Sequence, residues 1–269
     1  MGRAELFFLS VVKVPRFPQK LAAFKYSLQF DEQTQSLKSS LRLLAKACDE
    51  VVENKKLAGI LHRVLALGNF MNESAGKPKS AGITLDSLIK TAKKKGSDGK
   101  TTVLDHLITT AMNNKLDLVD FWSDMPAVRD AMRLNLDDFR SLLRECESGA
   151  QSVNRSIETE KSETKILDDS SCSYASKKFL HKLVPFLQRA TVEIENIKDL
   201  FQNVEMKVQS LCSFFAEDIK TCKASTIFGV LLDFSRLVDK SREQYHRKVK
   251  AAKRRESMTK NKAKVTPSS

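Results

Sequence analysis

The sequence predicts an all-α fold: an elongated helical domain with a long antiparallel coiled-coil hairpin and a basic C-terminal helix or tail. Nine glycines and six prolines in 269 residues fall well below the average usage of about 12% for the two together. So few turn residues exclude a β-sandwich or barrel. Two segments carry apolar residues at alternating spacings of three and four, which is a heptad pattern. The net charge is +13, and its excess gathers near the C-terminus.

The heptad pattern predicts two long helices packed against each other. The first seam is Leu136, Phe139, Leu143, Cys146, Ala150, Val153 and Ile157, and the second is Leu183, Leu187, Ala190, Ile194, Ile197, Phe201, Val204, Val208, Leu211 and Phe215. The second helix would be roughly 50 Å long, since a helix rises about 1.5 Å per residue. The polar stretch from Ser162 to Ser176 is expected to form the hairpin loop. Pairing between two chains is the alternative.

Shorter helices are expected before the seams. An apolar helix over residues 4–13 should end before Pro15. Pro18 suits the first turn of the next helix, which is expected to end near Phe30. Apolar residues at helical spacing over 37–48 predict a further helix.

The middle of the chain shows the same kind of pattern. Apolar residues over 57–67 predict a helix that ends at the run 68–72. A polar loop over 73–81 follows. Helices are then expected over 85–95 and over 98–112, the second one capped by its first residue.

No catalytic or metal-binding motif is present in the sequence. The four histidines lie apart, without metal-ligand spacing. Gly99-Lys100-Thr101 resembles the end of a phosphate-binding loop, but position 94 is lysine where that motif needs glycine. We therefore expect no enzyme activity, no cofactor, no metal and no small-molecule substrate. No apolar run approaches the 18 residues of a membrane span. Five cysteines without paired spacing indicate reduced thiols and a cytoplasmic protein.

The basic excess divides the chain into a body, residues 1–240, and a basic extension, residues 241–269, whose distal part we expect to be disordered. Between Ser241 and Lys264 there are ten Lys or Arg residues against two Glu residues. The candidate contacts in this tail are Arg247, Lys248, Lys250, Lys253, Arg254 and Arg255. Such a tail attracts a polyanion: an anionic membrane surface, nucleic acid or an acidic protein polymer. A solvated helix end is the alternative interpretation.

Seven motifs along the chain are distinctive: Val14-Pro15-Arg16, Phe24-Lys25-Tyr26-Ser27-Leu28-Gln29-Phe30, Ala47-Cys48-Asp49-Glu50, Leu65-Ala66-Leu67-Gly68-Asn69-Phe70-Met71-Asn72, Gly82-Ile83-Thr84-Leu85-Asp86-Ser87-Leu88, Phe214-Phe215-Ala216-Glu217-Asp218 and the run from Phe228 to Phe234. Together they resemble the formin homology-2 domain, the actin-assembling domain of formins. The resemblance spans nearly the whole chain. It implies an actin-binding module that nucleates filaments and processively caps their barbed ends, in the cytoplasm at the actin cytoskeleton.

The resemblance also assigns residues to two sites. Lys95 matches the family's actin-contacting lysine, and Lys93, Lys94 and Lys100 surround it. The alternative for these four is a solvated charge run. Gly68, Asn69, Phe70, Met71 and Asn72 match the "post", which the partner's "lasso" encircles in the family's homodimer. The alternative for this run is an ordinary helix terminus.

This chain departs from the family pattern in two places. The loop Glu73-Ser74-Ala75-Gly76-Lys77-Pro78-Lys79 lacks the usual paired glycines and arginine, and Ile83 stands where phenylalanine is usual. By the resemblance, we also expect this sequence to begin inside the family's "knob", with no lasso before Glu5. This start implies a mainly monomeric chain that nucleates poorly. The alternative function is a helical coiled-coil scaffold whose basic tail binds anionic lipid or nucleic acid.

Overall fold

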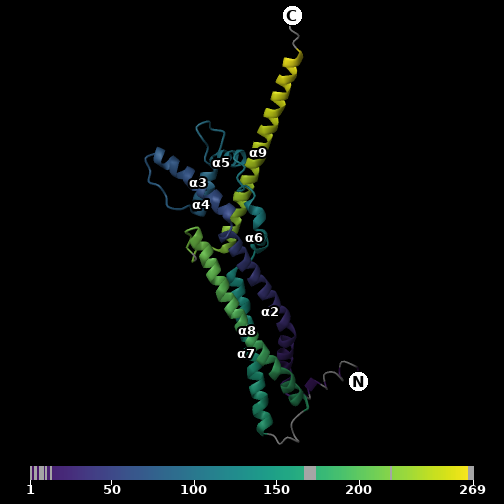
Figure 1. Ribbon diagram of the computed structural model, residues 1–269. Helices are drawn as coiled ribbons and strands as arrows, with labels where there is room; N and C mark the ends of the chain where they lie inside the picture. The colour runs from purple at the N-terminus through teal and green to yellow at the C-terminus, as the bar shows by residue number, and fades with distance from the viewer. Residues whose placement is uncertain are drawn as a thin grey trace. The chain divides into compact units, whose positions relative to one another are not determined.

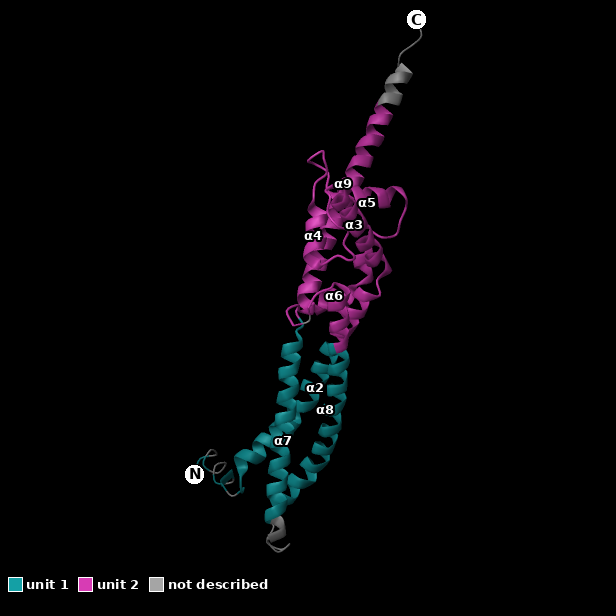
Figure 2. Cartoon of the chain, turned by 90° about the vertical axis from the view of Figure 1, so that its left-hand side faces the viewer, with its two compact units in different colours: residues 1–42, 134–205 teal, residues 43–133, 206–269 magenta. Residues whose placement is uncertain are grey.

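The computed structural model describes residues 14–166, 174–218 and 220–265, together with isolated positions before residue 14. Over these residues the secondary structure is helical, and the only β-type pairing is an isolated bridge between Lys95 and Thr102. The prediction of an all-α fold is therefore confirmed. The chain forms two compact units (Figure 2). Unit 1 comprises residues 1–42 and 134–205, and unit 2 comprises residues 43–133 and 206–269. The expected helix over 4–13 lies mostly outside the described residues.

Of the residues that the structure describes, those of unit 1 form three long helices, which Figure 1 labels α2, α7 and α8. They are α2 (Phe17–Val52, up to residue 42), α7 (Leu136–Ile166) and α8 (Tyr174–Phe214, up to residue 205). Ion pairs fix their directions. Arg140 pairs with Glu205 at 2.6 Å and Glu147 with Lys198 at 2.9 Å, so α7 and α8 run antiparallel.

The helix α2 runs parallel to α8. Asp31 pairs with Arg189 at 3.2 Å and Lys38 with Glu193 at 2.6 Å, so the residue numbers rise together on the two helices. The two predicted seam helices therefore exist, and a third helix packs on them. The expected loop over 162–176 is shorter than predicted, because α7 continues to Ile166 and α8 begins at Tyr174.

The predicted end of α2 near Phe30 is wrong. The helix continues to Val52, with Pro18 in its first turn as expected. Most polar residues after Phe30 are exposed, whereas the buried positions Phe30, Thr34, Leu37 and Leu41 keep the three-and-four spacing; the hydroxyl of buried Thr34 donates to the backbone carbonyl of Phe30 at 2.8 Å. No glycine or proline interrupts this stretch. A polar run on one face therefore does not end a helix.

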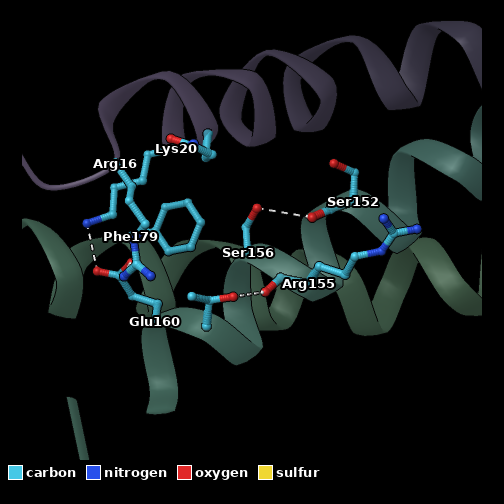
Figure 3. Close-up of a pocket in the computed structure, with 9 residues that line it drawn as sticks. Arg16, Lys20, Ser152, Arg155, Ser156, Glu160 and Phe179 are labelled. Atoms are coloured by element: carbon cyan, nitrogen blue, oxygen red, sulfur yellow. Dashed lines mark hydrogen bonds and ion pairs between the residues drawn. The ribbon is translucent and has the colours of Figure 1, made fainter. Parts of the chain in front are cut away.

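A buried ion pair lies at the start of α2 in unit 1. Lys20, which is 5% exposed, places its Nζ 2.7 Å from Oε1 of Glu160 and 5.7 Å from the centre of the Phe179 ring (Figure 3). Arg16 binds the other carboxylate oxygen of Glu160 at 2.6 Å. Burial on its own raises the pKa of Glu160, but hydrogen bonds from Lys20 and Ser176 and the nearby positive charges bring that pKa below its usual value.

Unit 2 is built from shorter helices around one long helix. They are α3 (Lys55–Ser74), α4 (Leu85–Lys93), α5 (Val103–Asn113), the 3₁₀ helix η1 (Phe121–Asp124), α6 (Pro126–Ala131) and α9 (Ala224–Val265). The helix α9 packs along α5, α4 and α6. Its Phe234 is fully buried, with its ring centre 5.8 Å from that of Phe121. This packing positions α3, α4 and α5 around the candidate site.

The expected cap of α5 is wrong. The helix begins at Val103, not at Asp98, because Thr102 and Asp105 form a reciprocal capping box. The Thr102 hydroxyl accepts from the Asp105 backbone N–H at 3.0 Å, and the Asp105 carboxylate accepts from the Thr102 N–H at 2.9 Å. Asp98 instead belongs to the turn before the helix.

Candidate functional site

The run Gly68–Asn72 lies inside α3, and the prediction that the helix ends there is wrong. The helix continues to Ser74 and ends in a Schellman motif. Gly76 has a φ of +68°, its N–H donates to Glu73 O at 3.0 Å, and the Lys77 N–H donates to Asn72 O at 2.8 Å. Because Gly76 is the residue with left-handed backbone conformation that terminates α3, Gly68 does not end the helix. A Cβ at Gly68 would lie 3.4 Å from Cγ2 of Thr91, so α4 approaches α3 closely at this point.

The side chains of this run point in different directions. Phe70 is 68% exposed, whereas Met71 is half-buried. Asn69 holds the following loop: its Nδ2 donates to Ser80 O at 2.9 Å, and its Oδ1 accepts from Ser80 N at 2.8 Å. The run therefore presents an exposed aromatic ring beside a loop that is fixed to the same helix.

The four candidate lysines lie on a closed turn between α4 and α5. Lys93 is the last residue of α4, Lys94 is its C-cap, and Lys95 and Lys100 lie in the turn. The Gly96 N–H donates to Thr101 O at 2.8 Å, and the Val103 N–H donates to Lys94 O at 2.8 Å. All four lysine side chains are exposed, and no carboxylate of the described residues lies within ion-pair distance of them.

Asp98 stabilises this turn from inside. One of its carboxylate oxygens accepts from the backbone N–H groups of Lys100 at 3.0 Å and Thr101 at 2.9 Å. Its other oxygen accepts from the Thr101 hydroxyl. These hydrogen bonds, the one from the Thr101 hydroxyl above all, lower the pKa of Asp98 to about 2. Asp98 is therefore ionised at neutral pH, and its carboxylate is occupied by the turn that carries the lysines.

A groove of about 420 Å³ lies between α3 and the turn that carries the lysines; Met71 lines it, and the four lysines do not. It is lined by Leu67, Met71, Gly96, Ser97, Asp98, Thr101, Thr102, Val103 and His106. One wall is the α3 run, and the other is the lysine turn with the first turns of α5. The structure thus brings together two segments that the sequence separates by more than twenty residues.

The helix α9 lies beside this region up to Tyr245. The Ser241 hydroxyl donates to Asp105 at 2.6 Å, and the Tyr245 hydroxyl donates to Asn113 at 2.9 Å. The positive charge of Lys248 contributes to the low pKa of Asp98, so this tail residue lies close to the lysine turn.

The six candidate tail residues Arg247, Lys248, Lys250, Lys253, Arg254 and Arg255 are all exposed. Every residue from 250 to 258 is exposed, whichever side of the helix it occupies. Residues 250–258 of α9 therefore form a helical segment without a covered face.

Several parts of this site carry no sequence signal of their own. The two hydrogen bonds of Asn69 depend on Ser80, a loop residue eleven positions away. Met71 and His106 line the same groove only because α3 and α5 pack together. The Thr102 and Asp105 capping box did have a signal, the spacing of three residues.

The described residues contain no group of three or more His, Cys, Asp or Glu side chains able to hold a metal ion. Burial raises the pKa of Cys48 to about 12 and that of Cys212 to about 11, so these thiols are protonated and poor nucleophiles at neutral pH. No helix among the described residues combines the length and the apolar character of a membrane span.

The fold and the site define an all-helical binding module with a grooved, basic surface. The family model of the Formin Homology 2 Domain matches residues 1–239, and the chain belongs to this family. Formin-like protein 5 of Oryza sativa subsp. japonica is 27% identical over 95% of this chain and 15% of its own length. Formin-like protein 3 of the same plant is 29% identical over 98% of this chain and 21% of its own length.

A shorter relative has a similar degree of identity. Formin-like protein 21b of Arabidopsis thaliana is 26% identical over 99% of this chain and 65% of its own length. The chain thus spans a fifth or less of most of the longer curated relatives that it matches. The family resemblance that the sequence motifs indicated is confirmed.

Proposed function

We propose that this chain is the actin-binding module of a formin, which nucleates actin filaments and processively caps their barbed ends. The observation that carries the proposal is the lysine turn. Lys93, Lys94, Lys95 and Lys100 are exposed on a turn that Asp98 and backbone hydrogen bonds hold in one conformation. Because the backbone of the turn is already ordered, binding of these lysines to an acidic protein surface does not have to order the loop that carries them. Lys95 is the residue that matches the family's actin-contacting lysine.

The groove beside the turn suits a second contact. Exposed Phe70 and groove-lining Met71 offer aromatic and flexible apolar surface for an aromatic anchor. In the homodimer that forms if the full-length chain carries a lasso, this anchor belongs to the partner's lasso, and Gly68, Asn69 and Asn72 complete its site on α3. Actin and the partner chain would then occupy adjacent surfaces of unit 2. This function places the protein in the cytoplasm, at the actin cytoskeleton, and requires no bond-making chemistry.

The charged helix α9 supports a second candidate function, a scaffold whose basic tail binds an anionic membrane surface or nucleic acid. Because its six candidate residues are exposed cations, attraction by this tail is electrostatic and weakens as salt screens it. Binding through the ordered lysine turn should depend on one particular lysine. Binding through the tail should depend on the total charge.

Co-sedimentation with actin filaments at low and high salt distinguishes the two functions. We expect the Lys95→Glu variant to lose most of the binding and the Lys77→Glu variant, on an exposed loop lysine, to keep it. Removal of residues 246–269 should make binding to actin filaments less sensitive to salt, while most of the binding at moderate salt remains. Full binding by Lys95→Glu, together with loss on tail removal, would contradict the proposal and favour the scaffold.

A further inference from the structure

The helix α9 carries the only two adjacent arginines in the sequence, and a serine follows them closely. Arg254 and Arg255 lie three and two residues before Ser257, and Met258 comes directly after the serine. Ser257 is exposed, and Met258 is 68% exposed. Two guanidinium groups, a hydroxyl and an apolar side chain therefore follow one another at fixed intervals in an exposed part of the helix.

This order of side chains matches what an arginine-directed serine kinase recognises. Such an enzyme pairs carboxylates of its substrate groove with arginines before the serine, and charge patterns of this kind contribute to kinase specificity. Each guanidinium group can form two parallel hydrogen bonds with one carboxylate, which a lysine cannot do. An apolar residue after the serine suits an apolar pocket of the enzyme. Because the groove binds its substrate in an extended conformation, the helix around Ser257 has to open first.

Opening this part of α9 costs little. Every residue from 250 to 258 is exposed, so the segment buries no apolar face against the described residues. Lys250 lies four residues before Arg254, and like charges at this spacing destabilise a helix. The Ser257 hydroxyl donates to Arg254 O at 2.9 Å, a hydrogen bond within the same helix. A helix held by local interactions alone is marginally stable in water, so extended conformations are accessible to this segment.

A second serine follows two basic residues at the same spacing, but it lies in the closed lysine turn. Ser97 comes after two lysines, which lack the fork of a guanidinium group. The Gly96 N–H donates to Thr101 O at 2.8 Å, and Asp98 accepts from the Thr101 N–H at 2.9 Å. An extended conformation at Ser97 would break both hydrogen bonds. The comparison therefore favours the serine of α9 as the kinase substrate.

We propose that Ser257 is a phosphorylation site for an arginine-directed serine kinase, and that the phosphate group weakens the attraction of the basic tail for an anionic membrane surface. In the transfer, Oγ of Ser257 forms a bond to the γ-phosphorus of ATP. The bond between that phosphorus and the bridging oxygen of ADP breaks, ADP leaves, and the hydroxyl proton passes to a base of the kinase.

The effect on the tail is electrostatic. Residues 246–258 hold six Lys or Arg residues against one Glu residue. A phosphoserine carries a charge of about −1.5 to −2 at pH 7, so it removes a substantial part of this positive excess. Basic residues near an anionic membrane each contribute about 1 kcal/mol to binding, which is about fivefold in affinity. Phosphorylation should therefore lower the affinity of the tail for such a membrane about tenfold or more.

Phosphorylation of the full chain tests the site. The probe is the catalytic subunit of cyclic-AMP-dependent protein kinase, an arginine-directed serine kinase, with magnesium and ATP. We expect mass spectrometry to place the phosphate on Ser257, and Ser257→Ala to remove it. Arg254→Lys and Arg255→Lys keep the charge but lose the forked donor, so each should lower kcat/KM about tenfold or more. The matched control is Arg247→Lys, an exposed arginine of the same helix outside the motif, which should leave kcat/KM unchanged.

Flotation with vesicles tests the effect of the charge. The vesicles contain phosphatidylcholine with about 20% phosphatidylserine, and binding is measured at low salt with the unmodified and the phosphorylated chain. The phosphorylated chain should bind about tenfold or more weakly. The Ser257→Ala variant, treated with kinase in the same way, should bind as the unmodified chain does.

Four outcomes would overturn the proposal. They are the absence of phosphate from Ser257, as much phosphate on Ser97 as on Ser257, equal kcat/KM values for Arg254→Lys and Arg247→Lys, and vesicle affinity that is absent or equal in the two forms. None of these results depends on actin, so the proposal stands or fails separately from the function proposed above.

Discussion

A close contact between α7 and α2 in unit 1 predicts an unusual response to a small substitution. A Cβ built on Gly149 of α7 would lie 2.2 Å from Cε2, 2.6 Å from Cδ2 and 2.8 Å from Cζ of Tyr26. Carbon atoms in contact lie about 3.5–4.0 Å apart, so Gly149→Ala requires the ring or the helix to move by more than about 1 Å. Tyr26 is not free to move: its hydroxyl donates to Cys146 O at 2.6 Å, and its ring packs against Phe30 and Phe186.

The expected magnitude follows from three contributions. Overpacking a core contact costs about 1–3 kcal/mol. Loss of the Tyr26 hydrogen bond costs about 0.5–1.5 kcal/mol. Replacing glycine by alanine in a helix stabilises it by about 1 kcal/mol. The net effect of Gly149→Ala is therefore a loss of about 0.5–3.5 kcal/mol in the free energy of unfolding, even though alanine is the better helix former.

Urea unfolding followed by circular dichroism measures this loss. The control is Gly229→Ala in α9, where no atom lies within 4 Å of the added Cβ, and we expect it to stabilise by about 0.5–1 kcal/mol. In a chain that already carries Tyr26→Ala, the Gly149→Ala substitution should also stabilise, because the clash is gone. Equal stabilisation by Gly149→Ala and Gly229→Ala in the chain with Tyr26 unchanged would show that the added methyl group does not clash with the Tyr26 ring.

Three further predictions concern polar groups. The pKa of Glu160 in the folded state lies below its ordinary value of 4.5, so its contribution to stability is complete above about pH 4.5 and is lost as pH falls through the folded pKa. In Glu160→Gln, the free energy of unfolding should therefore fall less steeply on acidification. At pH 7 the variant should lose about 3 kcal/mol in urea unfolding, because Lys20 is left without its anion. Asn69→Ala should speed hydrogen exchange at Ser80 at least tenfold, and unchanged exchange there would show that the Asn69 side chain does not hold the loop. Thr102→Ala should lower stability by about 1 kcal/mol through loss of the cap, which a thermal melt that does not shift would contradict.

The sequence predicted the helices of unit 1 better than their ends. The seams of α7 and α8 were evident because apolar residues recur without interruption from Leu136 to Ile157 and from Leu183 to Phe215. The end of α2 was misjudged because Asp31 follows a buried phenylalanine, and a polar residue looks the same in sequence on an exposed helix face as in a loop. The pattern predicted α2 as two separate helices, one that ends near Phe30 and one over 37–48, but only the tertiary structure shows that it is one helix and that it packs on α7 and α8.

The candidate site was predictable residue by residue but not as an arrangement. The resemblance assigned Lys95 and the run around Phe70 to separate roles. The groove between these two segments arises because α3 and the turn before α5 meet in unit 2. Asp98 was expected to cap α5 because its side chain can accept backbone hydrogen bonds. It does accept them, but from Lys100 and Thr101 within the turn. The sequence therefore indicated that Asp98 accepts backbone hydrogen bonds, but only the fold shows which N–H groups donate them.

We propose that the lysine turn of unit 2 contacts actin, and zero-length carbodiimide cross-linking followed by mass spectrometry tests this contact directly. The reagent joins a lysine amine only to a carboxylate in contact with it. We expect cross-linked peptides that contain Lys95 or its neighbours Lys93, Lys94 and Lys100. We also expect that Lys95→Glu abolishes these cross-links, whereas Lys77→Glu leaves them unchanged. Cross-links confined to the lysines of α9 beyond Tyr245, and unaffected by Lys95→Glu, would contradict the account and place the contact on the tail.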